Sequence, residues 1–115
     1  MVVSDNNILD SFPCLIITYS RPETCINLID ELIRQGCKRV YIALDFGKTR
    51  EVISVQKTLE TLEEKYQYKF EIFKVWRRTE NLGVAVSVIT AIDWFFDYEI
   101  CGIVLEDDLV IHKIF

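Results

Sequence analysis

Short apolar runs alternate along the chain with longer stretches in which apolar residues recur every three or four positions. The short runs, bounded by polar or glycine residues, predict buried strands, and the longer stretches predict amphipathic helices. Four strands are expected, at residues 14–18, 40–44, 69–76 and 102–105. Three helices are expected between them, at residues 22–36, 52–66 and 83–94.

Two of the expected strands differ in how polar residues interrupt them. Lys69, Glu71 and Lys74 break the apolar run at 69–76, which is typical of a strand at the edge of a sheet. The run at 102–105 (GIVL) has no such interruption and predicts a strand buried on both faces, as in parallel sheets.

The elements alternate throughout, in the order βαβαβαβ. This order predicts an α/β, Rossmann-like fold, in which helices cover both faces of a mostly parallel four-stranded sheet. Such sheets bind ligands beyond the carboxyl ends of their strands, where the strand order reverses. Four loops are therefore candidates for lining a site, at residues 19–21, 45–47, 77–83 and 106–108.

Three adjacent acids, Glu106, Asp107 and Asp108, follow the last apolar run. At a separation of about 4 Å, two carboxylates repel by about 1 kcal/mol in water and about 4 kcal/mol near a protein surface. A bound divalent cation would reverse that interaction, and hard oxygen ligands suit Mg²⁺ or Mn²⁺. The alternative is a solvated acidic loop that caps a following helix, but the position at the end of a buried strand favours a metal site.

Composition and charge narrow the possible partners. The chain has 115 residues, half of them hydrophobic and 27% charged, which fits one small globular domain. Its net charge of −5 argues against a nucleic acid or an anionic membrane as the main partner. The longest apolar-rich stretch, at residues 83–96, is too short to span a bilayer.

The four cysteines, Cys14, Cys25, Cys37 and Cys101, are widely spaced. Zinc sites need clustered ligands, and the chain has only one histidine, so a zinc site is not expected. Cysteines on apolar segments are expected to be reduced core residues, which agrees with a cytoplasmic location, as does the lack of a secretory signal at the start.

Three segments together resemble the nucleotide-binding half of a GT-A glycosyltransferase, a family that uses nucleotide-diphosphate sugars. They are residues 16–22 (IITYSRP), 81–83 (NLG) and 103–108 (IVLEDD). The nearest likeness is to the branch with a Glu-Asp-Asp metal motif, which includes N-acetylglucosaminyltransferase I-like enzymes and bacterial relatives. The resemblance covers nearly the whole chain, so residues 1–115 would form the nucleotide-sugar-binding half, without the acceptor-binding half.

The resemblance also implies roles for individual residues. Asp108 would bind the metal, Mn²⁺ or Mg²⁺, that bridges the two phosphates of a sugar donor, which is expected to be uridine-linked. Glu106 and Asp107 would contact metal-bound water, the ribose or the sugar. The remaining nucleotide contacts would come from Thr18, Tyr19, Arg21, Asp45, Asn81 and Gly83. A dication held by carboxylates would stabilise the charge that develops on a departing diphosphate.

The chain departs from the family in two ways. Relatives often carry Lys or Arg just after Asn-Leu-Gly, whereas here three apolar residues follow. Arg77 or Arg78 is a candidate for that charge, and the alternative is that both are solvated surface arginines. No base is expected after Asp108, because His112, alone in an apolar stretch, is a weak candidate. The resemblance implies an enzyme, and this chain alone is expected to be inactive or slow. The sequence does not identify the acceptor.

Other functions remain open to different degrees. A sugar nucleotidyltransferase is disfavoured because residues 19–23 contain no glycine, whereas those enzymes have a glycine-rich phosphate loop after the first strand. A receiver domain is disfavoured because Thr18 and Tyr19 stand where that domain has acids at the end of its first strand. The main alternative is a non-catalytic nucleotide-binding or oligomeric interaction module. The chain stops soon after its fourth strand, so self-association through that edge is expected unless the protein is longer.

Overall fold

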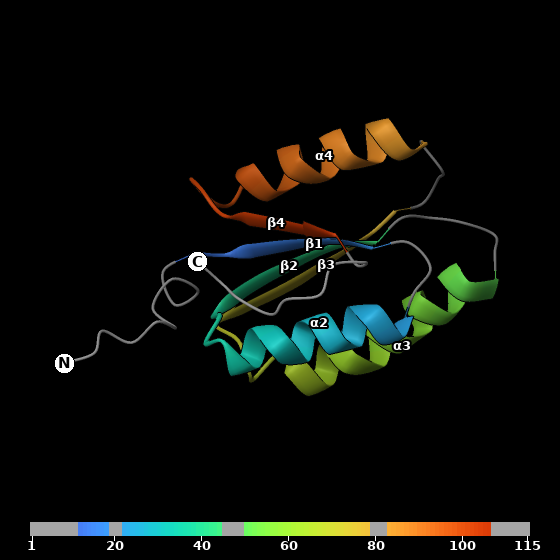
Figure 1. The fold of residues 1–115 in the computed structure, drawn as a ribbon. Helices are drawn as coiled ribbons and strands as arrows, with labels where there is room; N and C mark the ends of the chain where they lie inside the picture. The colour runs from blue at the N-terminus through green and yellow to red at the C-terminus, as the bar shows by residue number, and fades with distance from the viewer. Residues whose placement is uncertain (1–11, 19–21, 45–49, 79–82, 107–115) are drawn as a thin grey trace.

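Four parallel strands and three helices make up the computed structural model, which describes residues 12–18, 22–44, 50–78 and 83–106. The elements are, in order, β1 (Cys14–Thr18), α2 (Pro22–Arg34), β2 (Arg39–Leu44), α3 (Arg50–Tyr66), β3 (Ile72–Arg77), α4 (Val84–Phe96) and β4 (Ile103–Glu106). Helices α2 and α3 cover one face of the sheet and α4 covers the other (Figure 1). The α/β, Rossmann-like fold expected from the sequence is thereby confirmed.

The strand order is β3-β2-β1-β4, and every neighbouring pair is parallel. The first two crossovers therefore step in one direction, and the third returns past β1 to place β4 on its other side. The order reverses between β1 and β4, which makes their carboxyl ends the switch point of the fold. Figure 1 shows the amino-terminal ends of all three helices at this same end of the sheet.

Alternation along the strands divides the core into two halves. Cys14 and Ile16 of β1 face α2 and α3, whereas Leu15 and Ile17 face α4. All five β1 residues are buried, because β1 has a strand on each side and helices on both faces. The α4 half of the core is aromatic: the ring of Tyr41 meets those of Trp94 and Phe95 edge-on, at centroid distances of 5.7 and 5.1 Å.

Two of the strand predictions need correction. Strand β3 begins at Ile72 rather than Lys69, because the chain first turns at the end of α3, where the Lys69 N–H donates to the Tyr66 carbonyl at 2.8 Å. Strand β4 is not buried on both faces, since Val104 and Glu106 are exposed. Among the described residues β4 has only β1 as a neighbour, so it is an edge strand. The expected edge position of β3 is confirmed.

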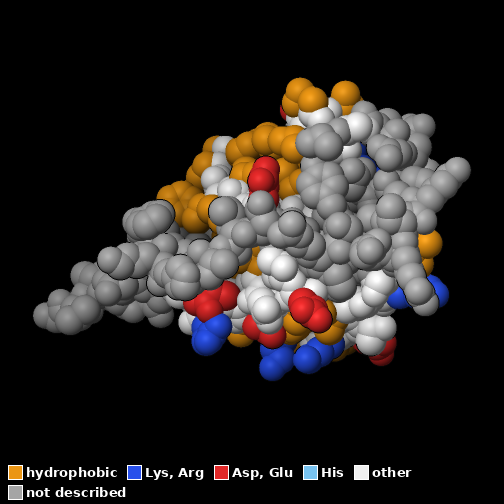
Figure 2. Space-filling view, turned by 45° about the vertical axis from the view of Figure 1, so that its right-hand side comes forward, with side chains coloured by type: hydrophobic (Ala, Val, Ile, Leu, Met, Phe, Trp, Pro, Cys, Tyr) orange, Lys and Arg blue, Asp and Glu red, His pale blue; other side chains and the backbone are white. Residues whose placement is uncertain are grey.

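Helix α4 exposes apolar side chains as well as burying them. Its inner residues Ala91 and Phe95 are fully buried. Apolar residues are also exposed on its outer side and just beyond its end: Val86, Ile89, Phe96 and Ile100. Figure 2 shows hydrophobic side chains gathered over α4, whereas charged side chains gather over α2 and α3. Among the described residues, no helix is both long enough and apolar enough to cross a membrane.

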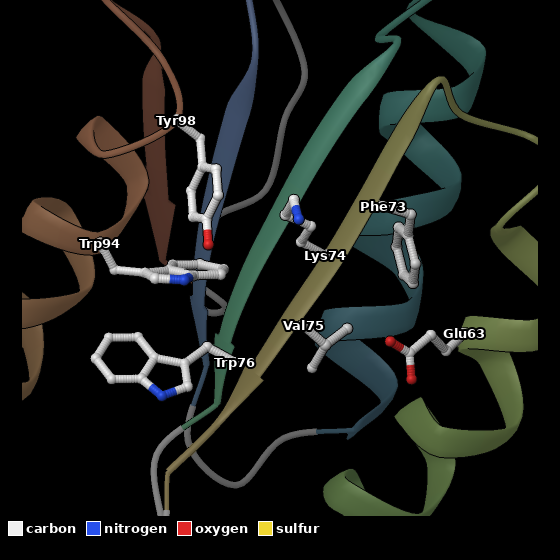
Figure 3. Close-up of a pocket in the computed structure, with 7 residues that line it drawn as sticks. All are labelled: Glu63, Phe73, Lys74, Val75, Trp76, Trp94 and Tyr98. Atoms are coloured by element: carbon white, nitrogen blue, oxygen red, sulfur yellow. The ribbon is translucent and has the colours of Figure 1, made fainter.

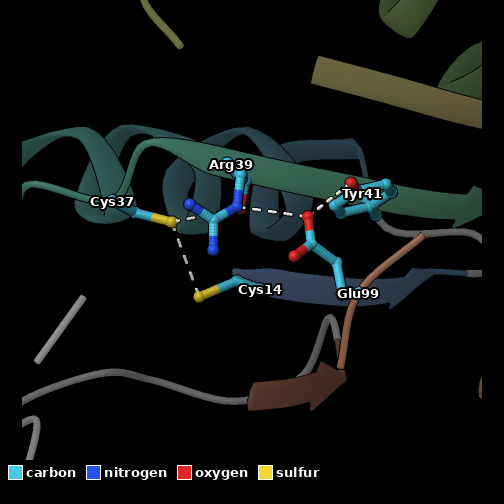
Figure 4. Close-up of polar contacts among 5 residues, drawn as sticks. All are labelled: Cys14, Cys37, Arg39, Tyr41 and Glu99. Atoms are coloured by element: carbon cyan, nitrogen blue, oxygen red, sulfur yellow. Dashed lines mark hydrogen bonds and ion pairs between the residues drawn. The ribbon is translucent and has the colours of Figure 1, made fainter. Parts of the chain in front are cut away.

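A polar network closes the amino end of the sheet (Figure 4). Glu99, after α4, accepts a hydrogen bond of 2.6 Å from the Tyr41 hydroxyl and one of 3.1 Å from Nε of Arg39. Nearby, the sulfurs of Cys14 and Cys37 lie 3.6 Å apart. When Cys37 ionises, the Cys14 thiol donates a hydrogen bond to the Cys37 thiolate. This bond lowers the pKa of Cys37, because it stabilises the thiolate, and raises the pKa of Cys14, because the donating thiol must keep its proton. Glu99 thereby ties the segment after α4 to β2.

The cysteines differ in exposure, which gives a direct test of the core. All four, which lie within the described residues, are thiols; Cys14, Cys25 and Cys37 are buried as expected, but Cys101 is exposed, contrary to expectation. We expect Cys101 alone to react rapidly with an alkylating reagent in the folded protein, and the others only after unfolding. Mass spectrometry of the alkylated chain checks this, with Cys101→Ser as the control that should leave no rapid reaction. Rapid modification of Cys14 or Cys37 would contradict the packing of β1.

Candidate functional site

The switch point brings the ends of β1 and β4 together. Glu106, the last residue of β4, is paired in register with Ile17, so it lies beside the end of β1, where Thr18 is the final residue. Thr18 is fully buried, and Glu106 is exposed. By the alternation of the strands, Thr18 faces α2 and α3, whereas Glu106 faces α4. The two candidates are therefore neighbours on opposite faces of the sheet.

Gly83 stands at the start of α4, over the face toward which Glu106 points. Its φ of 84° is in the region that favours glycine, and the carbonyl of Gly83 accepts a hydrogen bond of 2.9 Å from the Ser87 N–H. A Cβ added at Gly83 would meet nothing within 4 Å, so the backbone angle rather than lack of space accounts for the glycine. The amino end of a helix favours an anion, because its N–H groups and the helix dipole point toward it.

Six of the nine candidate residues lie outside the described part of the chain. They are Tyr19, Arg21, Asp45, Asn81, Asp107 and Asp108. Their expected roles stay predictions, including the metal-ligand role of Asp108. Within the described part, no group of three or more His, Cys, Asp or Glu side chains is placed to hold a metal. Glu106 is the one member of the acidic triplet whose position is described, and its exposed carboxylate is a hard oxygen donor of the kind that Mg²⁺ or Mn²⁺ prefers.

The two arginines considered as phosphate ligands hold helices against β3. Arg77 donates to Glu63 of α3 at 2.6 Å. Arg78, which is buried, donates to the Thr90 hydroxyl at 2.7 Å and to the Ser87 carbonyl at 2.6 Å, both on α4. Its guanidinium also lies 4.3 Å from the centre of the Trp76 ring. Both side chains therefore have structural contacts in the described fold.

A second candidate site, which the sequence reasoning did not identify, lies along β3. A hollow of about 270 Å³ is lined by Glu63, Phe73, Lys74, Val75, Trp76, Trp94 and Tyr98. Figure 3 shows Trp76, Trp94 and Tyr98 on one side of β3 and Phe73, Val75 and Glu63 on the other. The signal in the sequence is the pair of aromatic residues, Phe73 and Trp76, interleaved with the basic residues Lys74 and Arg77.

The described fold thus has two surfaces with distinct chemistry. At the carboxyl ends of β1 and β4, a carboxylate and the start of α4 lie on one face of the sheet, an arrangement suited to a cation and an anion bound together. Along β3, a strand edge is flanked by aromatic rings. Comparison of the chain with protein-family models, curated proteins and solved structures finds no match.

Proposed function

We propose that the chain binds a nucleotide-diphosphate sugar through Mn²⁺ or Mg²⁺ and serves as the donor-binding portion of a GT-A-type glycosyltransferase. The observation that carries the proposal is the position of Glu106 at the switch point, on the face where α4 begins. Asp107 and Asp108 continue the chain from there. These acids would hold the metal, and the amino end of α4 would favour the negative charge of a diphosphate.

The division of roles is the one that the resemblance to GT-A glycosyltransferases implies. Asp108 would supply the direct ligand charge to the metal, and Glu106 and Asp107 would contact metal-bound water, the ribose or the sugar. The metal supplies charge stabilisation for the leaving diphosphate. Thr18, Tyr19, Arg21, Asp45 and Asn81 contribute the nucleotide contacts that the resemblance implies, and Gly83 allows a close backbone approach.

Metal-dependent nucleotide binding tests the proposal. We expect calorimetry to detect UDP binding with Mn²⁺ and to lose it when EDTA is present. Asp108→Asn should weaken binding at least about tenfold, because a direct ligand charge is lost. Glu106→Gln should weaken it less, and it serves as the matched acid-to-amide control. Equal binding under EDTA would refute the metal bridge, and a larger loss in Glu106→Gln would move the direct ligand to that residue.

A second function is favoured by a different surface. The hollow along β3 suits an interaction module, which has no need of turnover. Release of nucleotide from a UDP-sugar, even slow, would identify the enzyme, because an interaction module would bind without releasing product. Nucleotide binding alone would not distinguish them.

A further inference from the structure

Strand β3 has a hydrogen-bonding edge that faces away from the sheet. The Ile72 and Arg78 N–H groups donate toward β2, to the carbonyls of Lys38 and Leu44, both at 3.2 Å. Backbone groups alternate sides along a strand, so those of Phe73, Val75 and Arg77 point outward. Among the described residues no strand lies beyond β3. An outward edge of this kind readily pairs with another strand.

The side chains around this edge form two walls. On the α4 face, Trp76 and Trp94 lie 5.4 Å apart between ring centroids. The ammonium of Lys74 lies 4.7 Å from the centre of the Tyr98 ring on that same face. On the α3 face the hollow is lined by Phe73, Val75 and Glu63 (Figure 3). The hollow follows the strand, so an added strand would meet side chains on both of its own faces.

The residues of β3 are complementary to themselves when the strand is reversed. About Val75, the aromatic Phe73 mirrors the cationic Arg77, and the cationic Lys74 mirrors the aromatic Trp76. In an antiparallel pair of two β3 strands centred on Val75, Lys74 would lie opposite the partner's Trp76. Phe73 would lie opposite the partner's Arg77. Cations opposite aromatic rings attract, so each half of the pair repeats the same favourable contacts.

Neighbouring registers lack this complementarity. Centring the pair on Lys74 would place that lysine opposite the partner's Lys74, and centring it on Trp76 would place Lys74 opposite the partner's Arg78. Like charges directly opposite one another destabilise strand pairing. The Val75-centred register also meets the backbone requirement, because Val75 points outward and can exchange two hydrogen bonds with the partner's Val75.

We propose that two copies of the chain associate through β3, antiparallel and centred on Val75, to form a continuous eight-stranded sheet. The occupant of the hollow is then a second copy of this chain. This edge is opposite to β4, the edge at which self-association was expected from the sequence. The β1–β4 switch points of both copies lie away from the pairing strands, so the inference does not depend on the proposed nucleotide binding.

Blocking each edge separately tests which one pairs. Val75→Pro removes an outward N–H and leaves the bonds to β2 in place. Val104→Pro is the matched control, because Ile103 donates to Pro13 of the neighbouring strand segment, so the Val104 N–H also points outward. We expect sedimentation velocity to show a dimer for the unsubstituted chain and for Val104→Pro. Val75→Pro should weaken the dimer by about a hundredfold.

Three outcomes of this experiment would overturn the proposal. The first is an unsubstituted chain that stays monomeric at all concentrations, which would leave the edge to a different protein. The second is loss of the dimer only in Val104→Pro. The third is an unchanged dimer in Val75→Pro. Circular dichroism establishes that each variant is folded, so that loss of the dimer is read only from folded chains.

A charge exchange tests the register and covers the case in which Val75→Pro fails to fold. Val75→Lys and Val75→Glu would each place like charges at the centre of the pair, and each should weaken its dimer by about tenfold. Mixing the two should restore dimers, because lysine then lies opposite glutamate. Native mass spectrometry distinguishes the mixed dimer by mass. Absence of mixed dimers from two folded variants would refute pairing centred on Val75.

Discussion

Gly102→Ala is expected to lower the free energy of unfolding by about 2–3 kcal/mol, a large effect for the addition of one methyl group. A Cβ at this position would lie 2.4 Å from Cζ of Phe95 and 2.8 Å from the carbonyl oxygen of Pro13. Phe95 is fully buried, and the Pro13 carbonyl accepts the Ile103 N–H at 2.9 Å. Relief of the clash therefore disturbs either the aromatic core or the first bond between β1 and β4.

Gly83→Ala is the matched control for this measurement. Nothing lies within 4 Å of an added Cβ there, so its cost comes from the backbone angle alone, about 1 kcal/mol. Urea unfolding of both variants gives the comparison. Phe95→Leu removes the ring atoms with which the added methyl group clashes. Gly102→Ala should therefore cost less stability in a Phe95→Leu background than in the unsubstituted chain. Equal stabilities of the two alanine variants would contradict the close packing of β4 against α4.

Two buried tyrosines are expected to make the fold unstable in alkali. Burial is the main cause and the hydrogen bond to Asp30 the second cause that raise the pKa of Tyr66 to about 12. In the same way, burial first and the hydrogen bond to Glu99 second raise the pKa of Tyr41 well above its ordinary value. Between pH 10 and the raised pKa values, only the unfolded chain releases these protons, so ionisation favours unfolding. Stability is complete below about pH 10 and is lost as the pH rises.

The slope of stability against pH measures this effect. Each tyrosine contributes up to about 1.4 kcal/mol per pH unit, so together they contribute at most about 3 kcal/mol per pH unit near pH 11. Denaturant unfolding at a series of pH values should show Tyr41→Phe and Tyr66→Phe each removing about half of that slope. Both variants are compared with the unsubstituted chain at pH 7, which separates the lost hydrogen bond from the titration. An unchanged slope in both variants would show that neither phenol holds its proton more tightly in the fold.

The sequence predicted the parts of the fold that local pattern determines. Cys14–Thr18 is fully apolar up to its last residue, and both of its ends were placed correctly. Gly36, with φ of 85°, follows the end of α2 as expected, and the Gly36 and Cys37 N–H groups donate to the last turn of that helix. The apolar run that predicts a strand from Lys69 to Trp76 includes Phe70. Phe70 instead packs on Tyr66 and Phe73, whose contacts come from the tertiary fold.

The candidate site was predictable only in part, because it depends on which strands become neighbours. The acidic triplet and Gly83 were recognisable in the sequence, but the proximity of Glu106 to the end of β1 follows from the crossover after β3. The exposure of β4 could not be predicted from the apolar composition of the strand. Exposure depends on the tertiary neighbours of the strand, and among the described residues only β1 lies beside β4. The hollow along β3 was missed because Trp94 and Tyr98 reach it from α4, outside the local pattern.

The pairing of β1 with β4 has a consequence for how the protein emerges from the ribosome. Cys14 of β1 pairs with Ile103, near the other end of the described chain. Strands β1, β2 and β3 can assemble in the order of synthesis, but one side of β1 has to wait for residues 103–106. A partly synthesised chain therefore presents the most buried strand of the finished fold as an open, apolar edge. During this interval the edge is open to pairing with other chains, and slower synthesis of residues 103–106 would prolong it.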